Sequence, residues 1–103
     1  MPHARKRARS RRLRVKPERI DAAVAAFESD QLPSYKEQAG FRGFTMLANR
    51  ESGKMLGISY WEDEEGVRAS EGLGRAAGEQ AAETGEGEVE GPDEWVVVLD
   101  EDV

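Results

Sequence analysis

Two neighbouring segments in the middle of the chain carry apolar side chains at both odd and even positions. They span residues 41–49 and 54–61 and read FRGFTMLAN and KMLGISYW. Successive side chains of a strand point to opposite faces, so a strand with one face in water would alternate between apolar and polar residues. The Ser52-Gly53 pair between the segments favours a hairpin. The pattern therefore predicts two paired strands that are covered on both faces.

A strand and a helix are predicted before this hairpin. Leu13 and Val15 alternate with basic residues, which is the period of a strand over residues 9–15. Apolar side chains then recur at helical spacing across residues 20–27 and predict an amphipathic helix over residues 17–31.

The remaining elements flank the hairpin on either side. Pro33 interrupts the first helix, and a capping-box pattern predicts a further short turn over residues 34–37. A second helix is predicted over residues 64–83. Residues 84–93 are rich in Gly and Glu and include a proline, so a loop is expected there. The run EWVVVL at residues 94–99 predicts the last strand, again apolar on both faces.

The order strand–helix–strand–strand–helix–strand predicts a ferredoxin-like α+β fold. With right-handed crossovers, four strands form an antiparallel sheet and both helices cover one of its faces. The strands are apolar on both faces, so the other face needs a cover too. We expect a second copy of the chain to supply it, with Leu56, Ile58 and Tyr60 in the interface of the homodimer.

Length and composition bound the class of protein. The 103 residues predict one small domain over residues 9–99, between a basic arm at residues 1–8 and an acidic tail at residues 100–103. The chain has no cysteine and its one histidine is His3, so disulfides, iron–sulfur clusters and cysteine-ligated zinc are excluded. The carboxylates of residues 62–65 point in different directions at a helix start, and no metal site is predicted.

Neither a membrane span nor a secretory signal is visible. No run approaches the roughly 20 apolar residues that cross a bilayer. The basic N-terminus lacks the apolar segment of a signal peptide. Together with the absence of cysteine, this predicts a cytoplasmic protein without a membrane partner.

The charge is divided along the chain. Residues 1–16 hold eight of the 15 basic residues and no acid, which leaves seven basic residues against all 21 acids and a net charge of −14 beyond them. An arginine-rich arm suggests nucleic-acid binding. The acidic body would repel phosphate, however, and no aromatic residue interleaves with the arginines to stack on bases. We favour an arm that binds its own acidic body or is solvated, with no nucleic-acid partner.

The second predicted helix is unusually rich in glycine, with four between residues 64 and 83. Each glycine weakens a helix by about 0.5–1 kcal/mol relative to alanine. One interpretation is a broken helix. The other is a space between helix and sheet, because Gly57 and Ser59 are small residues on the same strand face as Trp61. Trp61 is then one wall of a ligand pocket, or it belongs to the core.

Several short motifs resemble antibiotic biosynthesis monooxygenase (ABM) domains. They are GFRG at residues 40–43, SYWEDEE at 59–65, RAS at 68–70 and EWVV at 94–97, and the resemblance covers residues 13–99. It implies a dimeric α+β barrel with a pocket inside each subunit, between sheet and helices. The residues expected to bind a ligand there are Phe27, Tyr35, Gly57, Ser59, Trp61 and Leu73.

The resemblance does not imply a single activity, because members of the family differ in what they do. Members include oxygenases that need no cofactor and act on aromatic compounds, haem-degrading enzymes and proteins of unknown role. The oxygenase pattern places Asn and Tyr where this chain has Gly57 and Val67, and the haem pattern needs a helix histidine that is absent. Haem degradation is therefore disfavoured. A cofactor-free monooxygenase for a planar hydrophobic or aromatic substrate and a non-catalytic homodimer that binds a small ligand both remain open, and no residue is assigned as catalytic.

Overall fold

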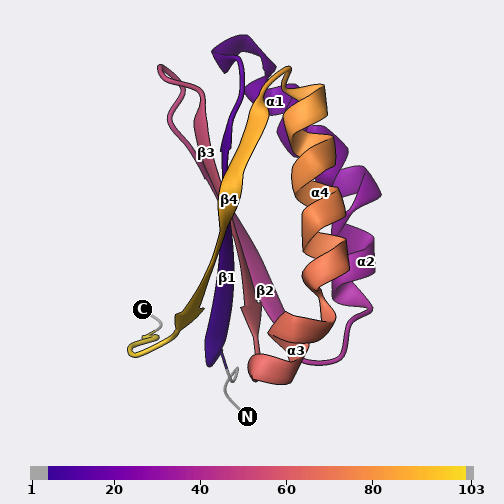
Figure 1. The fold of residues 1–103 in the computed structure, drawn as a ribbon, viewed down its shortest axis with the longest axis vertical. Coiled ribbons are helices and arrows are strands. Elements are labelled where there is room, and N and C mark those ends of the chain that lie inside the picture. The colour runs from indigo at the N-terminus through magenta and orange to yellow at the C-terminus, as the bar shows by residue number, and fades with distance from the viewer. Residues whose placement is uncertain (1–4, 102–103) are drawn as a thin grey trace.

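The chain forms a four-stranded antiparallel sheet with helices packed on one of its faces (Figure 1). The computed structural model describes residues 5–101. The strands are β1 (Arg7–Arg14), β2 (Phe41–Ala48), β3 (Lys54–Trp61) and β4 (Glu88–Val96), in the spatial order β2-β3-β1-β4. The helices are the 3-10 helix η1 (Pro17–Arg19) and the α-helices α1 (Ile20–Asp30), α2 (Leu32–Lys36), α3 (Glu64–Ala69) and α4 (Glu71–Thr84). The predicted ferredoxin-like α+β fold is confirmed.

The core lies between the sheet and the long helices α1 and α4. Leu13 and Val15, on the helix side of β1 and just after it, pack in one buried cluster with Ile20 and Ala23 of α1 and Ala81 of α4. Alanines on α4 let the helix lie close to the sheet. Burial of a side chain such as that of Ile20, which is 1% exposed, stabilises the fold by about 1.5–3 kcal/mol.

The second predicted helix is divided in two, and the predicted break near Pro33 is present. Pro33 lies in the first turn of α2, where its missing N–H costs nothing, so it starts a helix as well as ending one. The second helix is broken at Ser70, whose backbone leaves the α conformation. The Asp63 side chain caps α3 by accepting a hydrogen bond from the Gly66 N–H at 3.0 Å.

The position of the last strand corrects the sequence prediction. β4 begins at Glu88, inside the expected loop, and ends at Val96, short of the predicted end at Leu99. It is an edge strand that pairs only with β1, so Pro92 and a bulge near Gly91 are tolerated. Val98 and Leu99 lie beyond the strand and are 92% and 79% exposed.

Basic residues of the N-terminal segment pair with acidic residues at the other end of the chain. The pairs are Arg12–Asp93 and Arg14–Glu90 at 3.3 Å and Lys16–Glu86 at 2.7 Å. β1 starts at Arg7, two residues before the predicted strand. Residues 1–4 of the predicted arm and residues 102–103 of the predicted tail lie outside the described residues.

No helix covers the second face of the sheet within residues 5–101 (Figure 1). In the same residues, no helix is long and apolar enough to cross a membrane. The helix-covered face and the open face therefore present two different surfaces, and each must be considered as a binding site.

Candidate functional site

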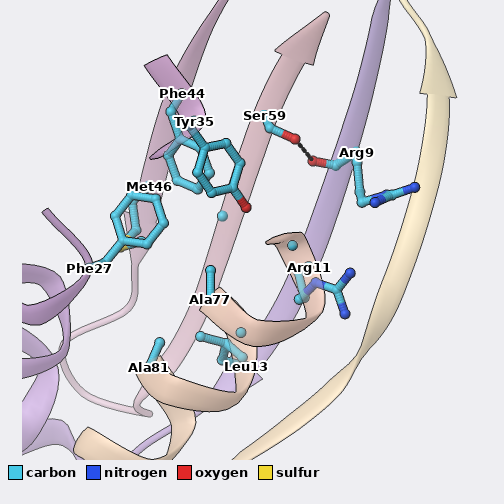
Figure 2. Close-up of a pocket in the computed structure, with 13 residues that line it drawn as sticks. Arg9, Arg11, Leu13, Phe27, Tyr35, Phe44, Met46, Ser59, Ala77 and Ala81 are labelled. Atoms are coloured by element: carbon cyan, nitrogen blue, oxygen red, sulfur yellow. Dashed lines mark hydrogen bonds between the residues drawn. The ribbon is translucent and has the colours of Figure 1, made fainter. Parts of the chain in front are cut away.

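A small cavity lies between the helix-covered face of the sheet and α4 (Figure 2). Its volume is about 30 Å³, which is room for one or two water molecules. It is lined by Arg9, Arg11, Leu13, Phe27, Tyr35, Phe44, Met46, Gly57, Ser59, Gly74, Ala77, Gly78 and Ala81. No carboxylate or imidazole is among these lining residues, so within the described chain the wall offers donors but no strong base.

One wall of the cavity is aromatic. The ring of Phe27 lies 4.5 Å from that of Phe44, and the Tyr35 ring meets the Phe44 ring edge-on at 5.3 Å, measured between ring centroids. The three rings come from α1, α2 and β2, so the wall exists only in the folded chain. Such rings pack well against a flat apolar molecule.

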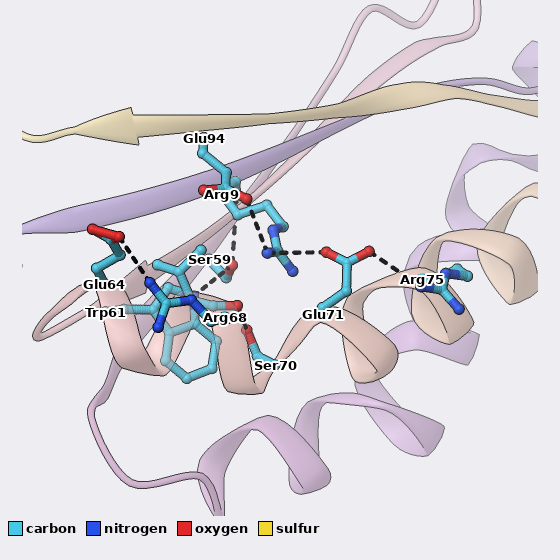
Figure 3. A network of polar contacts seen from close by, with 10 residues as sticks. Arg9, Ser59, Trp61, Glu64, Arg68, Ser70, Glu71, Arg75 and Glu94 are labelled. Carbon is cyan, nitrogen blue, oxygen red and sulfur yellow. Dashed lines mark hydrogen bonds and ion pairs between the residues drawn. The ribbon is translucent and has the colours of Figure 1, made fainter.

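Two arginines of β1 form the opposite wall. Arg9 and Arg11 share the strand face of Leu13, which points toward the helices. Arg9 is 4% exposed, and its Nη2 forms ion pairs with Glu71 at 3.0 Å and Glu94 at 3.4 Å (Figure 3). Both carboxylates bind the same nitrogen, so Nε and Nη1 of this guanidinium make no ion pair with them.

The inner donors of these arginines have no partner in the described chain. Nε and Nη1 of Arg9 and Nη2 of Arg11 are buried, and no residue from 5 to 101 accepts a hydrogen bond from them. A buried donor without an acceptor costs about 1–3 kcal/mol, and a charged one costs more. Three such donors around one cavity therefore indicate a place where water or a ligand supplies the acceptors.

Glycines on α4 make room for the arginines. A Cβ at Gly78 would overlap the Cδ of Arg11, so the arginine stem crosses directly against the helix backbone there. A Cβ at Gly74 would lie 3.2 Å from Arg11 Nη2, 3.5 Å from Arg9 Nη1 and 3.7 Å from the Tyr35 hydroxyl. The glycine-rich helix thus contains space as predicted, but the Arg11 side chain fills part of it.

Burial changes the acid–base behaviour of two cavity groups. The pKa of the Tyr35 phenol is raised, mainly by burial, although the positive charges of Arg11 and Arg9 oppose the shift. The pKa of Arg11 is lowered, first by burial and then by repulsion from Arg9. At neutral pH Tyr35 therefore remains a neutral donor beside a crowded pair of cations.

The six predicted ligand residues separate into two groups. Phe27, Tyr35, Gly57 and Ser59 line the cavity, whereas Trp61 and Leu73 do not. Gly57 does not leave open space either, because the Phe44 ring lies 3.1 Å from where its Cβ would be. Contact of any of the six with a ligand stays a prediction.

Trp61 belongs to the core. It is 0% exposed and packs against the rings of Tyr35 and Phe41, and a Cβ at Gly66 would lie 3.0 Å from its ring. Its indole N–H donates to the Ser59 hydroxyl at 2.8 Å (Figure 3). Ser59 in turn donates to the backbone carbonyl of Arg9 at 3.5 Å. Trp61 therefore positions one side of the cavity from behind, through Ser59.

The three residues predicted for a dimer interface lie together on the open face of the sheet. Leu56, Ile58 and Tyr60 line a groove of about 530 Å³ whose other lining residues are Asp93 and Trp95 of β4 and Ala8, Ser10 and Arg12 of β1. Trp95 donates to the Ser10 hydroxyl at 2.8 Å, yet 55% of its surface remains exposed. The groove is mostly apolar, and its contact with a second copy stays a prediction.

Sequence reasoning missed Arg9 and Arg11. Both lie in the predicted strand over residues 9–15, within the basic segment of residues 1–16 that was interpreted as paired with acids or solvated. The available signal was the strand period: a strand that buries Leu13 and Val15 must point residues 9 and 11 to the same covered face. An arginine at a covered position needs acceptors, which makes it a candidate for binding.

No metal site is visible in the described part of the chain. Within residues 5–101, no three His, Cys, Asp or Glu side chains lie close enough to hold an ion together. The cavity instead offers guanidinium and phenol donors, which suit an anion and not a cation.

Solved structures show where this fold recurs. A protein of unknown function from Nitrosomonas europaea is 22% identical over 97% of this chain and 96% of its own, with a TM-score of 0.70. A Streptomyces coelicolor monooxygenase, solved with nanaomycin D, is 17% identical over 95% of this chain and 90% of its own, with a TM-score of 0.67. SnoaB, a cofactor-independent oxygenase from Streptomyces nogalater, is 15% identical over 97% of this chain and 98% of its own, with a TM-score of 0.61.

Comparison of the sequence with known proteins identifies its family. An uncharacterised protein of Mycobacterium tuberculosis is 33% identical over 63 residues, which are 61% of this chain but only 27% of that protein. The aligned stretch thus spans about a quarter of the curated relative. The model of the family described as antibiotic biosynthesis monooxygenase matches residues 8–82, which includes β1 with both arginines and nearly all of α4. The chain belongs to the antibiotic biosynthesis monooxygenase (ABM) family.

Proposed function

We propose that the protein is a cofactor-independent monooxygenase for a small, planar aromatic or enolic compound. The observation that carries the proposal is the buried cavity with an aromatic wall on one side and unpartnered guanidinium donors on the other. Rings can pack against the first wall, and negative charge that develops on oxygen during the reaction is stabilised by the second.

The chemistry requires little from the protein. The O–H bond of a phenol or enol ionises, and a carbon of the resulting phenolate or enolate, which shares its negative charge, forms a C–O bond with O₂; the hydrogen on that carbon leaves as a proton. Cleavage of the O–O bond then leaves a ketone or quinone and one molecule of water, so no other reductant is needed. Because the described lining holds no carboxylate or imidazole, the first proton leaves through water, which limits the substrates to acidic ones.

The cavity must widen for such a substrate. Its volume of about 30 Å³ admits water but not an aromatic ring. Phe27, Phe44 and Met46 form the movable side, and methionine is the most adaptable of these side chains. The proposal therefore includes a shift of this wall when substrate binds.

Oxygen uptake tests the proposal directly. Anthrones, naphthols and 1,3-dicarbonyl compounds are suitable probes, and ¹⁸O₂ should deliver one labelled atom to the product and one to water. Gly74→Ala, whose Cβ projects toward the arginines, should lower the rate, whereas Gly72→Ala has no neighbour within 4 Å and should not. Uptake no faster than the uncatalysed rate with every probe would reject the oxygenase.

A second candidate is a homodimer that binds a small ligand without turnover. The specific observation in its favour concerns the two positions where the oxygenase pattern has Asn and Tyr. Val67 is 2% exposed in the Trp61 cluster, and the space beside Gly57 is filled by Phe44. Tight binding of a probe that is recovered unchanged under oxygen would support this function.

We also propose that either function is carried out by a homodimer formed through the open face of the sheet. The groove beside Leu56, Ile58 and Tyr60 is mostly apolar, and Trp95, which also lines it, is 55% exposed. A two-fold axis lets the same patch of a second copy cover this surface.

A further inference from the structure

Two arginine side chains enter the cavity from β1 with donors that nothing in residues 5–101 accepts. The donors are Nε and Nη1 of Arg9 and Nη2 of Arg11. A guanidinium remains protonated and has no lone pair to offer, so these atoms can only donate. The groups that meet them must be acceptors from outside the described chain.

The donors converge on one point beside α4. An atom bonded to the Gly74 Cα would lie 3.2 Å from Arg11 Nη2, 3.5 Å from Arg9 Nη1 and 3.7 Å from the Tyr35 hydroxyl. The three side chains come from β1 and α2, far apart in sequence, and they gather around one face of Gly74. A ligand oxygen in the cavity beside this face, clear of the helix backbone, can therefore reach more than one of these donors.

The charge around this point does not balance. Glu71 pairs with Arg9 at 3.0 Å and with Arg75 at 3.4 Å, and Glu94 pairs with Arg9 at 3.4 Å (Figure 3). Arg11 makes no ion pair with any described residue. Glu71, Glu94 and Arg75 all lie on the outer, more exposed side, whereas Arg11 on the inner side has no carboxylate paired with it among the described residues.

We propose that the part of the cavity beside Gly74 is an oxyanion subsite, and that the cavity takes its ligand as an organic anion whose negative oxygen binds Arg9, Arg11 and Tyr35. The inference rests on the proposed function because it names the substrate class of the same cavity. The aromatic rings hold the flat body of the ligand, and the arginine pair selects its charge.

Two chemical sources can supply the oxyanion. One is a carboxylate, which arrives already ionised. The other is a phenol or enol that ionises on binding: its O–H bond breaks, the proton passes to water, and the electron pair stays on the oxygen beside the arginines. Neither arginine takes up that proton, because both are already protonated. In the second case the subsite lowers the pKa of the bound phenol.

Paired probes separate charge from shape. Benzoate and benzamide have nearly the same shape but differ in charge, and their dissociation constants can be measured by calorimetry with the full-length protein. We expect benzoate to bind at least about tenfold more tightly, since charge-assisted hydrogen bonds are worth more than neutral ones. 4-Nitrophenol tests the second source, because its anion is yellow: binding should shift its absorbance titration to lower pH.

The variant Arg11→Met removes the charge but keeps a stem that fits against Gly78. We expect the benzoate preference to fall to about one and the 4-nitrophenol shift to disappear. Arg14→Met is the matched control, because Arg14 lies on the same strand but on the opposite face and pairs with Glu90 at 3.3 Å. It should retain both effects.

Gly74→Ala is a second test that keeps every charge and strengthens the helix. Its methyl group would project between the donors and narrow the space for a ligand, so anion binding should fall while the protein stays folded, and Gly72→Ala should bind normally. Equal affinity for benzoate and benzamide, no binding of either, or no effect of Arg11→Met would overturn the inference. Anion-selective binding without oxygen uptake would support the oxyanion subsite and would reject only the oxygenase function.

Discussion

The stem of Arg11 lies directly against the backbone of α4 at Gly78, so closely that a Cβ there would overlap the arginine Cδ. This contact explains why a helix that covers the sheet contains glycine at a position where alanine would form a better helix. A side chain at Gly78 would push either the arginine or the helix away from the sheet.

We therefore expect Gly78→Ala to destabilise the protein, although the same change usually strengthens a helix. The overlap costs about 1–3 kcal/mol, as for other overpacked cores, and exceeds the roughly 0.5–1 kcal/mol gained from helix propensity. Gly72→Ala is the control, since no atom lies within 4 Å of its Cβ position, and it should stabilise by about 0.5–1 kcal/mol. Urea unfolding measures both, and equal stabilisation by the two changes would contradict the packing of Arg11.

The arginine contact also shows where sequence reasoning reached its limit. The spacing of apolar residues was enough for the fold, because the positions 20, 24 and 27 and the hairpin around Gly53 each admit one local structure. Burial of Arg9 could have been derived from the strand period. Its convergence with Tyr35 beside Gly74 could not, because it depends on the distance between α4 and β1, which a local pattern does not contain.

The end of the chain illustrates a different limit. Residues 94–99 are the most apolar run near the C-terminus, yet β4 begins at Glu88. Acidic residues form this strand because its partner β1 is basic, as the pairs Arg12–Asp93 and Arg14–Glu90 show. Pairing of opposite charges across strands is a tertiary relationship, and it outweighs the low strand propensity of glutamate and glycine here.

We expect Trp61 to contribute mainly to the free energy of unfolding and to affect ligand binding only indirectly. It is 0% exposed, lies against Gly66, and its indole N–H is held by Ser59. We expect Trp61→Ala to lower the free energy of unfolding by about 3–5 kcal/mol, as for other large buried side chains.

A milder change tests the same point without unfolding the protein. Trp61→Phe keeps most of the packing and removes the hydrogen bond to Ser59. Benzoate affinity should then change by less than about threefold. A large loss of affinity with an unchanged melting temperature would show that Trp61 contacts the ligand after all.

Tyr35 predicts a pH dependence of stability with a definite sign. Burial raises the pKa of its phenol in the folded protein above the ordinary value of 10.0. Above about pH 10 the unfolded chain therefore loses this proton before the folded chain does, and the free energy of unfolding falls as the pH rises. Near neutral pH the phenol is protonated in both the folded and the unfolded chain, so it adds no pH dependence to the free energy of unfolding.

Comparison with Tyr35→Phe separates the contribution of the Tyr35 phenol to stability from that of the lysines and arginines, which titrate in the same pH range. The stability difference between wild type and Tyr35→Phe, measured by urea unfolding, should be constant from about pH 7 to pH 9 and shift in favour of the variant from about pH 10 to pH 11. A difference that does not change with pH would mean that the phenol is not buried as described.

The open face of the sheet gives the last prediction, a homodimer whose interface contains Ile58. Leu56, Ile58 and Tyr60 lie beside the exposed ring of Trp95, and Arg5 covers only one edge, with its guanidinium 4.8 Å from the Tyr60 ring centroid. Burying these apolar side chains from two copies stabilises a dimer by about 10 kcal/mol before the cost of association is subtracted.

Ile58→Asp should therefore prevent assembly, because burying a carboxylate in this mostly apolar groove would cost several kcal/mol. Sedimentation should show a dimer for the wild type at micromolar concentration and a monomer or aggregates for the variant. Glu79→Lys, on the exposed side of α4, is the control and should sediment as the wild type does. The cavity lies on the opposite side of the sheet, so a wild type that is folded and monomeric would remove the dimer proposal while leaving the anion site to be judged by its own tests.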